Sequence, residues 1–264
     1  MKRKFLSLGL VLVLVAAVFT GCAKKEAPVN ENDSAETSTD MGKDLKDGSY
    51  LIKMPVSDHG NYPMATLEVK DGQVAGFSYN EYLADSGEEK NESNYKYPEG
   101  LAVIKDLNEQ FNEKKDLSQV DFDAVSGATH TKESFKEVVA ALIDKADKGE
   151  EYTPAFKDGE YEAKAAEASH GWLAQAKVVV KEGQIVGVDY AEIAVEDMDG
   201  VKTGDRKSAE NYTYEESFNV INAVQKLVID NNGSENLSLD GITGATNTRT
   251  TMVELVSQAL NTAK

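Results

Sequence analysis

The pattern of hydrophobic and polar residues predicts strands early in two stretches of the chain. β-branched runs flank the pair Asp71-Gly72, and similar runs flank Glu182-Gly183. An acidic residue followed by glycine favours the tight turn that joins two antiparallel strands. The sequence therefore predicts a β-hairpin around each pair.

Four later segments have the apolar spacing of a helix with one buried face. The two earlier stripes are Leu101, Ile104, Leu107 and Phe111, and then Phe218, Ile221, Val224 and Val228. The two later stripes are Phe135, Val138, Val139, Leu142 and Ile143, and then Met252, Leu255, Val256, Ala259 and Leu260. We interpret these stripes as core and not as cofactor-binding surfaces. The predicted fold class is α+β, with helices packed on an antiparallel sheet.

The same succession of short motifs occurs twice. The segments 46–50, 59–60, 66–74, 94–97 and 126–129 return in the same order as 157–161, 170–171, 177–185, 211–214 and 243–246. Each copy has the length of a small globular domain and is too long for a solenoid unit. We therefore expect two tandem homologous domains, at 46–148 and 157–264.

The N-terminus has the pattern of an export signal. Lys2, Arg3 and Lys4 precede an apolar run at 6–19, which is short for a membrane span. The run leads into Phe19-Thr20-Gly21-Cys22 and resembles a bacterial lipobox, with Phe19 where leucine is commoner. The resemblance implies a signal peptide at 1–21 and a lipid on Cys22. An ordinary secretory signal followed by a chance cysteine is the alternative.

Composition extends this interpretation. Residues 22–45 are polar and predict a flexible tether behind the lipidated cysteine. Cys22 is the only cysteine, so no disulfide or metal thiolate is expected in the folded part. The net charge of −18 argues against nucleic acid as a partner. The expected location is the outer face of the cell membrane, with a lipid anchor.

One short motif carries the candidate chemistry. Residues 123–129 read DAVSGAT and residues 240–246 read DGITGAT, so both fit Asp-x-x-Ser/Thr-Gly-Ala-Thr. The glycine permits a tight turn, and the last threonine presents a hydroxyl just before a helix, which Thr131 and Thr248 are expected to cap. Free N–H groups at that helix start favour a phosphate. A plain helix-capping turn is the alternative.

This motif resembles the flavinylation sequence of the FMN-binding domain family, which includes subunits of sodium-pumping quinone reductases and of Rnf-type complexes. In that family the final threonine accepts FMN from FAD through a phosphoester, in a reaction performed by a separate flavin transferase. The resemblance implies two covalent FMN groups, on Thr129 and Thr246. The recognition turns it implies consist of Asp123, Ser126, Gly127 and Ala128, and of Asp240, Thr243, Gly244 and Ala245.

A lipobox, a tether and two such domains together resemble the flavinylated lipoproteins of Gram-positive extracellular electron transfer, some of which are pheromone lipoproteins. That resemblance implies electron flow from a membrane quinol-linked donor to ferric iron or small-molecule acceptors. A redox carrier is favoured over a substrate-specific enzyme, because no nucleophile–base constellation occurs. A flavin reductase subunit would need an NAD(P)H site, and no Gly-x-Gly-x-x-Gly occurs. A non-catalytic ligand-binding or peptide-pheromone precursor lipoprotein is the alternative.

The histidines add one further expectation. His59 and His170 occupy the same column of the two copies, where they either contact the isoalloxazine ring or only fix a turn. Trp172 stands where the first copy has Asn61, so we expect the two flavins to differ in midpoint potential. None of the three histidines has metal-ligand spacing to another histidine or to cysteine, so no metal site is expected.

Overall fold

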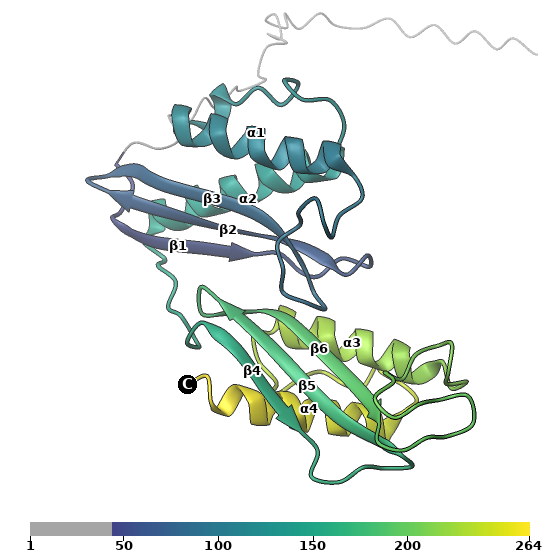
Figure 1. Cartoon of the computed structure of the whole chain (residues 1–264). Helices are drawn as coiled ribbons and strands as arrows, with labels where there is room; N and C mark the ends of the chain where they lie inside the picture. The colour runs from purple at the N-terminus through teal and green to yellow at the C-terminus, as the bar shows by residue number, and fades with distance from the viewer. Residues whose placement is uncertain (1–43) are drawn as a thin grey trace, which may run out of the picture. The chain divides into compact units, whose positions relative to one another are not determined.

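The computed structural model describes residues 44–264 (Figure 1). The predicted signal peptide, Cys22 and nearly all of the predicted tether lie outside the described residues. Within 44–264, no helix is both long enough and apolar enough to cross a membrane.

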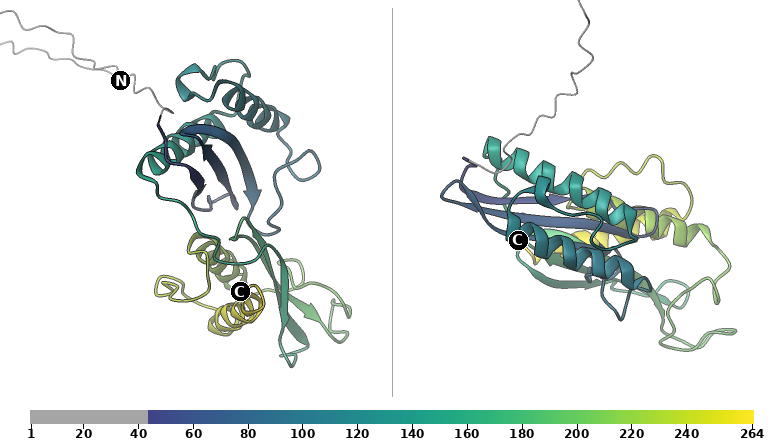
Figure 2. Two further views of the ribbon diagram at one scale, coloured as in Figure 1. Left: turned by 90° about the vertical axis from the view of Figure 1, so that its left-hand side faces the viewer. Right: turned by 90° about the horizontal axis from the view of Figure 1, so that it is seen from above.

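The first half of the described chain, residues 46–148, contains one antiparallel sheet and two long helices. Its elements are β1 (Gly48–Lys53), β2 (Asn61–Lys70), β3 (Gln73–Leu83), α1 (Pro98–Lys114), a short 3-10 helix (Leu117–Gln119) and α2 (Thr129–Lys148). The strand order is β1-β2-β3. Figure 2 shows both helices on one face of this sheet.

The second half, residues 157–264, has the same order of strands and long helices. Its elements are β4 (Gly159–Lys164), β5 (Trp172–Lys181), β6 (Gln184–Ala194), α3 (Glu216–Asp230) and α4 (Thr246–Asn261), and its strand order is β4-β5-β6. The central strands share an irregularity, since the register shifts at Glu68/Val69 in β2 and at Val179/Val180 in β5. The predicted α+β class is confirmed.

Both predicted hairpins are present. β2 and β3 are joined through Asp71 and Gly72, whose φ angles are 54° and 74°. β5 and β6 are joined through Glu182 and Gly183, with φ angles of 51° and 64°. Two successive residues of positive φ match the twist of the flanking strands, which explains why an acidic residue and glycine occupy these turns.

The predicted helix stripes form most of the core, with corrections in α1 and α3. The stripes of α2 and α4 are buried along their whole length, as are Ile104, Leu107 and Phe111 of α1, whereas Leu101 is only partly buried and Gly100 and Val103 are buried instead. In α3, however, the buried residues begin with Ser217 and Val220, whereas Phe218 and Ile221 are only partly buried. The predicted stripe for α3 was therefore wrong at its N-terminal end. It followed the apolar residues Phe218 and Ile221, whereas the polar Ser217 beside Phe218 is buried.

The two halves contact each other within one compact unit. Tyr62 of β2 donates a hydrogen bond through its hydroxyl to the carbonyl of Val186, 2.7 Å away. Lys53 of β1 donates from Nζ to the carbonyls of Ile229, at 2.6 Å, and Ile185, at 3.1 Å. Because Ile229 lies at the C-terminal end of α3, this ammonium group meets the negative end of the helix dipole.

Candidate functional site

The two predicted recognition turns have the same backbone geometry. Gly127 and Ala128 have φ angles of 87° and 47°, and α2 begins at the next residue, Thr129. Gly244 and Ala245 have φ angles of 83° and 34°, and α4 begins at Thr246. Positive φ favours glycine, which explains Gly127 and Gly244, whereas the same region strains the backbone of Ala128 and Ala245.

The start of each helix differs from the sequence expectation. Thr129 and Thr246 are the first residues of their helices, and the N-caps are Ala128 and Ala245, without a side-chain cap hydrogen bond. The expectation that Thr131 and Thr248 cap these helices was wrong. Thr131 lies inside the first turn of α2, where its side chain is 8% exposed and faces the sheet.

Both attachment candidates are accessible. Thr129 and Thr246 are exposed, as are the other polar residues of the two motifs, Asp123, Ser126, Asp240 and Thr243. Because neither helix start carries a side-chain cap, the first backbone N–H groups are available at the positive end of the helix dipole. An exposed hydroxyl beside such donors fits a phosphate that is esterified to it.

Each turn packs against the start of the other long helix of its half. A Cβ atom built on Gly127 would lie 3.6 Å from the Cβ of Glu99, in the first turn of α1. One built on Gly244 would lie 3.4 Å from the Cβ of Glu216, in the first turn of α3. The two helix starts of each half therefore lie beside its motif.

Tyr214 lies beside the turn of the second half, at the position that Tyr97 occupies in the first copy. In the second half the backbone N–H of Ala245 donates to the hydroxyl of Tyr214, 3.3 Å away. Tyr214 is 43% exposed and its counterpart Tyr97 is 52% exposed. Tyr95 and Tyr212 are partly buried, and the ammonium groups of Lys90 and Lys207 lie over their rings.

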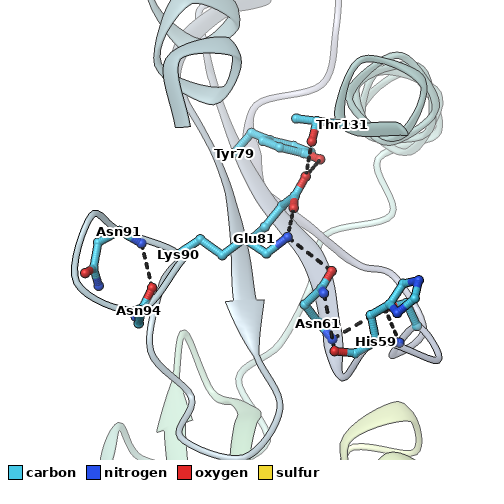
Figure 3. Close-up of polar contacts among 9 residues, drawn as sticks. His59, Asn61, Tyr79, Glu81, Lys90, Asn91, Asn94 and Thr131 are labelled. Carbon is cyan, nitrogen blue, oxygen red and sulfur yellow. Dashed lines mark hydrogen bonds and ion pairs between the residues drawn. The ribbon is translucent and has the colours of Figure 1, made fainter. Parts of the chain in front are cut away.

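A buried charge pair is hydrogen-bonded to Thr131, two residues after the motif of the first half (Figure 3). Glu81 of β3 is 7% exposed, and one of its carboxylate oxygens lies 2.5 Å from Nζ of Lys90. The other accepts hydrogen bonds from the hydroxyl of Thr131, at 2.8 Å, and from that of Tyr79, at 3.3 Å. Burial raises the pKa of Tyr79 above its ordinary range, and the charge of Glu81 adds to the effect.

The second half repeats the pair with different neighbours. Glu192 pairs with Lys207 and accepts from the Tyr190 hydroxyl at 3.1 Å. The ammonium of Lys207 lies 3.9 Å from the ring centroid of Tyr212 and 4.9 Å from that of Trp172. In the first half Lys90 lies 4.2 Å from the ring centroid of Tyr95, but Asn61 replaces the tryptophan.

Sequence reasoning did not find these charge pairs. The signal was available in β3, where Phe77, Tyr79 and Glu81 follow the two-residue period of the buried face. A carboxylate in that column must be paired or hydrogen-bonded to be buried. Its lysine could not be located in this way, because Lys90 lies in the irregular segment after the strand.

His59 and His170 lie in the loops between the first two strands of each sheet, whereas His130 is the second residue of α2. His59 is exposed between β1 and β2, and its carbonyl accepts a hydrogen bond from the Asn61 side chain at 3.5 Å. His170 is exposed and has a φ of 51°. Contact of either ring with a flavin stays a prediction. Across residues 44–264, no group of three or more His, Cys, Asp or Glu side chains is placed to hold a metal ion.

Comparison with known proteins bears on the first motif. Residues 63–144 match the family model of the FMN-binding domain. This segment is an FMN-binding domain. It includes β3, α1 and the whole 123–129 motif, together with most of β2 and α2, so the predicted family is confirmed for this segment. The narrower similarity to lipoproteins of extracellular electron transfer stays a prediction.

Other comparisons add little to this assignment. The crystal structure of the CPE2226 protein from Clostridium perfringens is similar at 24% sequence identity and a TM-score of 0.36, over 41% of this chain and 93% of that one. A TM-score of this size carries no weight for the fold. Among curated proteins, none matches the chain.

Proposed function

We propose that this protein is a lipid-anchored electron-transfer flavoprotein with two tandem homologous FMN-binding domains, which hold FMN covalently on Thr129 and Thr246. One observation carries the proposal. Each half presents an exposed threonine as the first residue of a helix, directly after a turn of positive φ. The first of these motifs lies inside the segment that matches the FMN-binding family.

The residues of each motif have distinct roles in this proposal. The threonine hydroxyl forms the ester, and the uncapped N–H groups of the first helical turn bind the remaining phosphate oxygens. Glycine permits the positive φ of the turn, and the small side chain of alanine leaves space for a phosphate close to the backbone. Bound FMN supplies one- and two-electron chemistry, which belongs to the cofactor and not to the chain.

The partners follow from the same proposal. A flavin transferase loads both threonines, and a lipid on Cys22 holds the protein at the outer face of the membrane. A quinol-linked membrane donor reduces the flavins, and ferric iron or small molecules accept the electrons. Covalent attachment suits this location, because FMN that dissociated outside the cell would be lost by dilution.

Mass spectrometry of the protein co-expressed with a flavin transferase tests the proposal. The experiment compares the parent with Thr129→Ala, Thr246→Ala and the double variant. We expect two covalent FMN adducts on the parent, one on each single variant and none on the double variant. Peptide-level spectra should place each adduct on the threonine of its motif.

A second transferase substrate serves as the control for activity. If that control is flavinylated while the parent chain stays bare, the electron-carrier proposal fails. A ligand-binding or pheromone-precursor lipoprotein would then be the better interpretation. An adduct only on Thr129 would reject the second flavin site and keep the first.

A further inference from the structure

The first turn of α2 is bonded to the sheet through a buried carboxylate. The hydroxyl of Thr131, two residues after the attachment candidate Thr129, donates to Glu81 at 2.8 Å. Both groups are buried, with exposures of 8% and 7%. A hydrogen bond to a buried charge is stronger than a neutral one and is costly to break. This bond therefore restricts how far the start of α2 can move.

Glu81 is itself held from several sides. Nζ of Lys90 lies 2.5 Å from one carboxylate oxygen, and the side chains of Glu81 and Lys90 are only 9% and 4% exposed. The ammonium also donates to the Asn61 side chain at 3.2 Å and lies over the ring of Tyr95. Figure 3 shows the contacts that run from Thr131 through Glu81 and Lys90 to Asn61. The carboxylate is thus a fixed anchor and not a mobile acceptor.

The second half keeps the charge pair but not this bond. Glu192 pairs with Lys207 and accepts from Tyr190. In the described part of the chain, the corresponding Thr248 makes no hydrogen bond to Glu192, and it is only partly buried. Other contacts of the first turn are shared, since Lys132 donates to the carbonyl of Val125 at 2.6 Å and Arg249 donates to that of Ile242 at 2.7 Å.

We propose that Glu81, acting through Thr131, is a positioning residue for flavin attachment at Thr129, and that the second half lacks this device. The inference rests on the proposed function. In the transfer, the Thr129 oxygen forms a bond to the FMN phosphorus of FAD and the bond from that phosphorus to AMP breaks. AMP leaves, and the hydroxyl proton passes to the transferase or to water. A fixed helix start keeps the hydroxyl oriented for this attack.

The test measures the rate of FMN incorporation at each threonine separately. Apo full-length protein is incubated with FAD and flavin transferase, and peptide mass spectrometry follows Thr129 and Thr246. Thr131→Val should slow incorporation at Thr129 by about tenfold while Thr246 in the same molecule is unaffected. Thr131→Ser restores the hydroxyl and should recover the parent rate within about twofold. The matched variant Thr248→Val should leave the rate at Thr246 unchanged.

Hydrogen exchange supplies a readout that does not depend on the transferase. Amides 132–135, which begin with the first amide of α2 bonded within the helix, Lys132 to the carbonyl of Ala128, should exchange faster in Thr131→Val than in the parent and in Thr131→Ser, with amides 249–252 unchanged. Global unfolding of the first half would instead speed exchange throughout β1 to β3. In that case Thr131→Ala, which removes the hydroxyl and leaves the Glu81–Lys90 pair intact, takes the place of Thr131→Val and should slow incorporation at Thr129 only.

Two results would overturn the inference while the proposed function stands. One is a parent-like rate at Thr129 in folded Thr131→Val, and the other is a Thr131→Ser variant as slow as Thr131→Val. A parent protein that takes up no FMN at either threonine would reject the proposed function itself, and the positioning role with it.

Discussion

At the scale of single residues, the two halves differ most around their buried lysines. Lys90 donates to the amide oxygen of Asn61, whereas Lys207 lies against the rings of Trp172 and Tyr212. A polar neighbour and an aromatic one give a charge different surroundings. This difference occurs in a pair of strands and loops that otherwise correspond closely.

The two flavin sites should therefore differ in midpoint potential. Thr129→Ala leaves FMN only in the second half and Thr246→Ala only in the first, so redox titration of each variant gives one potential. We expect a difference of about 30 mV or more, which is about 1.4 kcal/mol for a two-electron couple. Asn61→Trp in the Thr246→Ala background should move the first potential toward the second. Equal potentials in the two single variants would contradict this prediction.

At the scale of elements, the start of α2 depends on an alanine with left-handed backbone. Ala128 has a φ of 47° and is the N-cap of the helix. A β-branched residue is strongly disfavoured there, because its branched side chain crowds the backbone at positive φ. The helix start is therefore more sensitive to substitution than its exposure suggests.

Ala128→Val should lower the free energy of unfolding by about 1–2 kcal/mol. The matched control is Ala124→Val, in the same exposed segment but at a residue without positive φ. It should change stability by less than about 0.5 kcal/mol. Urea denaturation of apo protein measures both. Similar losses in the two variants would show that strain at residue 128 is not what limits this position.

α3 shows how the surroundings of an element determine its buried face. Phe218 and Ile221 line a cavity of about 310 Å³ together with Glu192 and Lys207, so they remain partly accessible. The fully buried positions lie one residue earlier, at Ser217 and Val220. The predicted stripe is therefore correct at Val224 and Val228 and wrong only in the first turns of the helix.

At the scale of the whole molecule, Lys53 connects the two halves, and the burial of its ammonium group lowers the stability of the folded state. Burial lowers the pKa of Lys53 to about 8, and nearby Asp230 offsets this only partly. The unfolded chain keeps a pKa near the ordinary value of about 10.4. Between these values the unfolded state binds the proton and the folded state does not, so stability rises with pH across this interval.

The parent should therefore gain stability relative to Lys53→Met between about pH 8 and 10, by up to about 3 kcal/mol. Below pH 8 the difference between the two proteins should be constant, because the lysine is protonated in both states. Urea denaturation at several pH values measures the difference. A parallel pH dependence in the two proteins would show that Lys53 does not titrate with a lowered pKa.

The sequence alone determined the two hairpins, the four long helices and the place of the motif, but not the first strand of each sheet, β1 and β4. The turn pairs at 71–72 and 182–183 predicted the hairpins because few residues adopt positive φ. The apolar periods of α2 and α4 predicted the buried faces, since both helices lie flat on a sheet. The location of the motif before a helix followed from its small residues and from the apolar stripe behind it.

Tertiary structure decided the remaining features. Lys90 and Thr131 converge on Glu81 from different segments, and a local pattern does not show which distant side chains meet. Thr131 was expected to cap α2 because threonine is a common N-cap residue. Its hydroxyl donates instead to the buried carboxylate of Glu81. Local preferences act over a few residues, whereas pairing of a buried charge depends on the whole packed half.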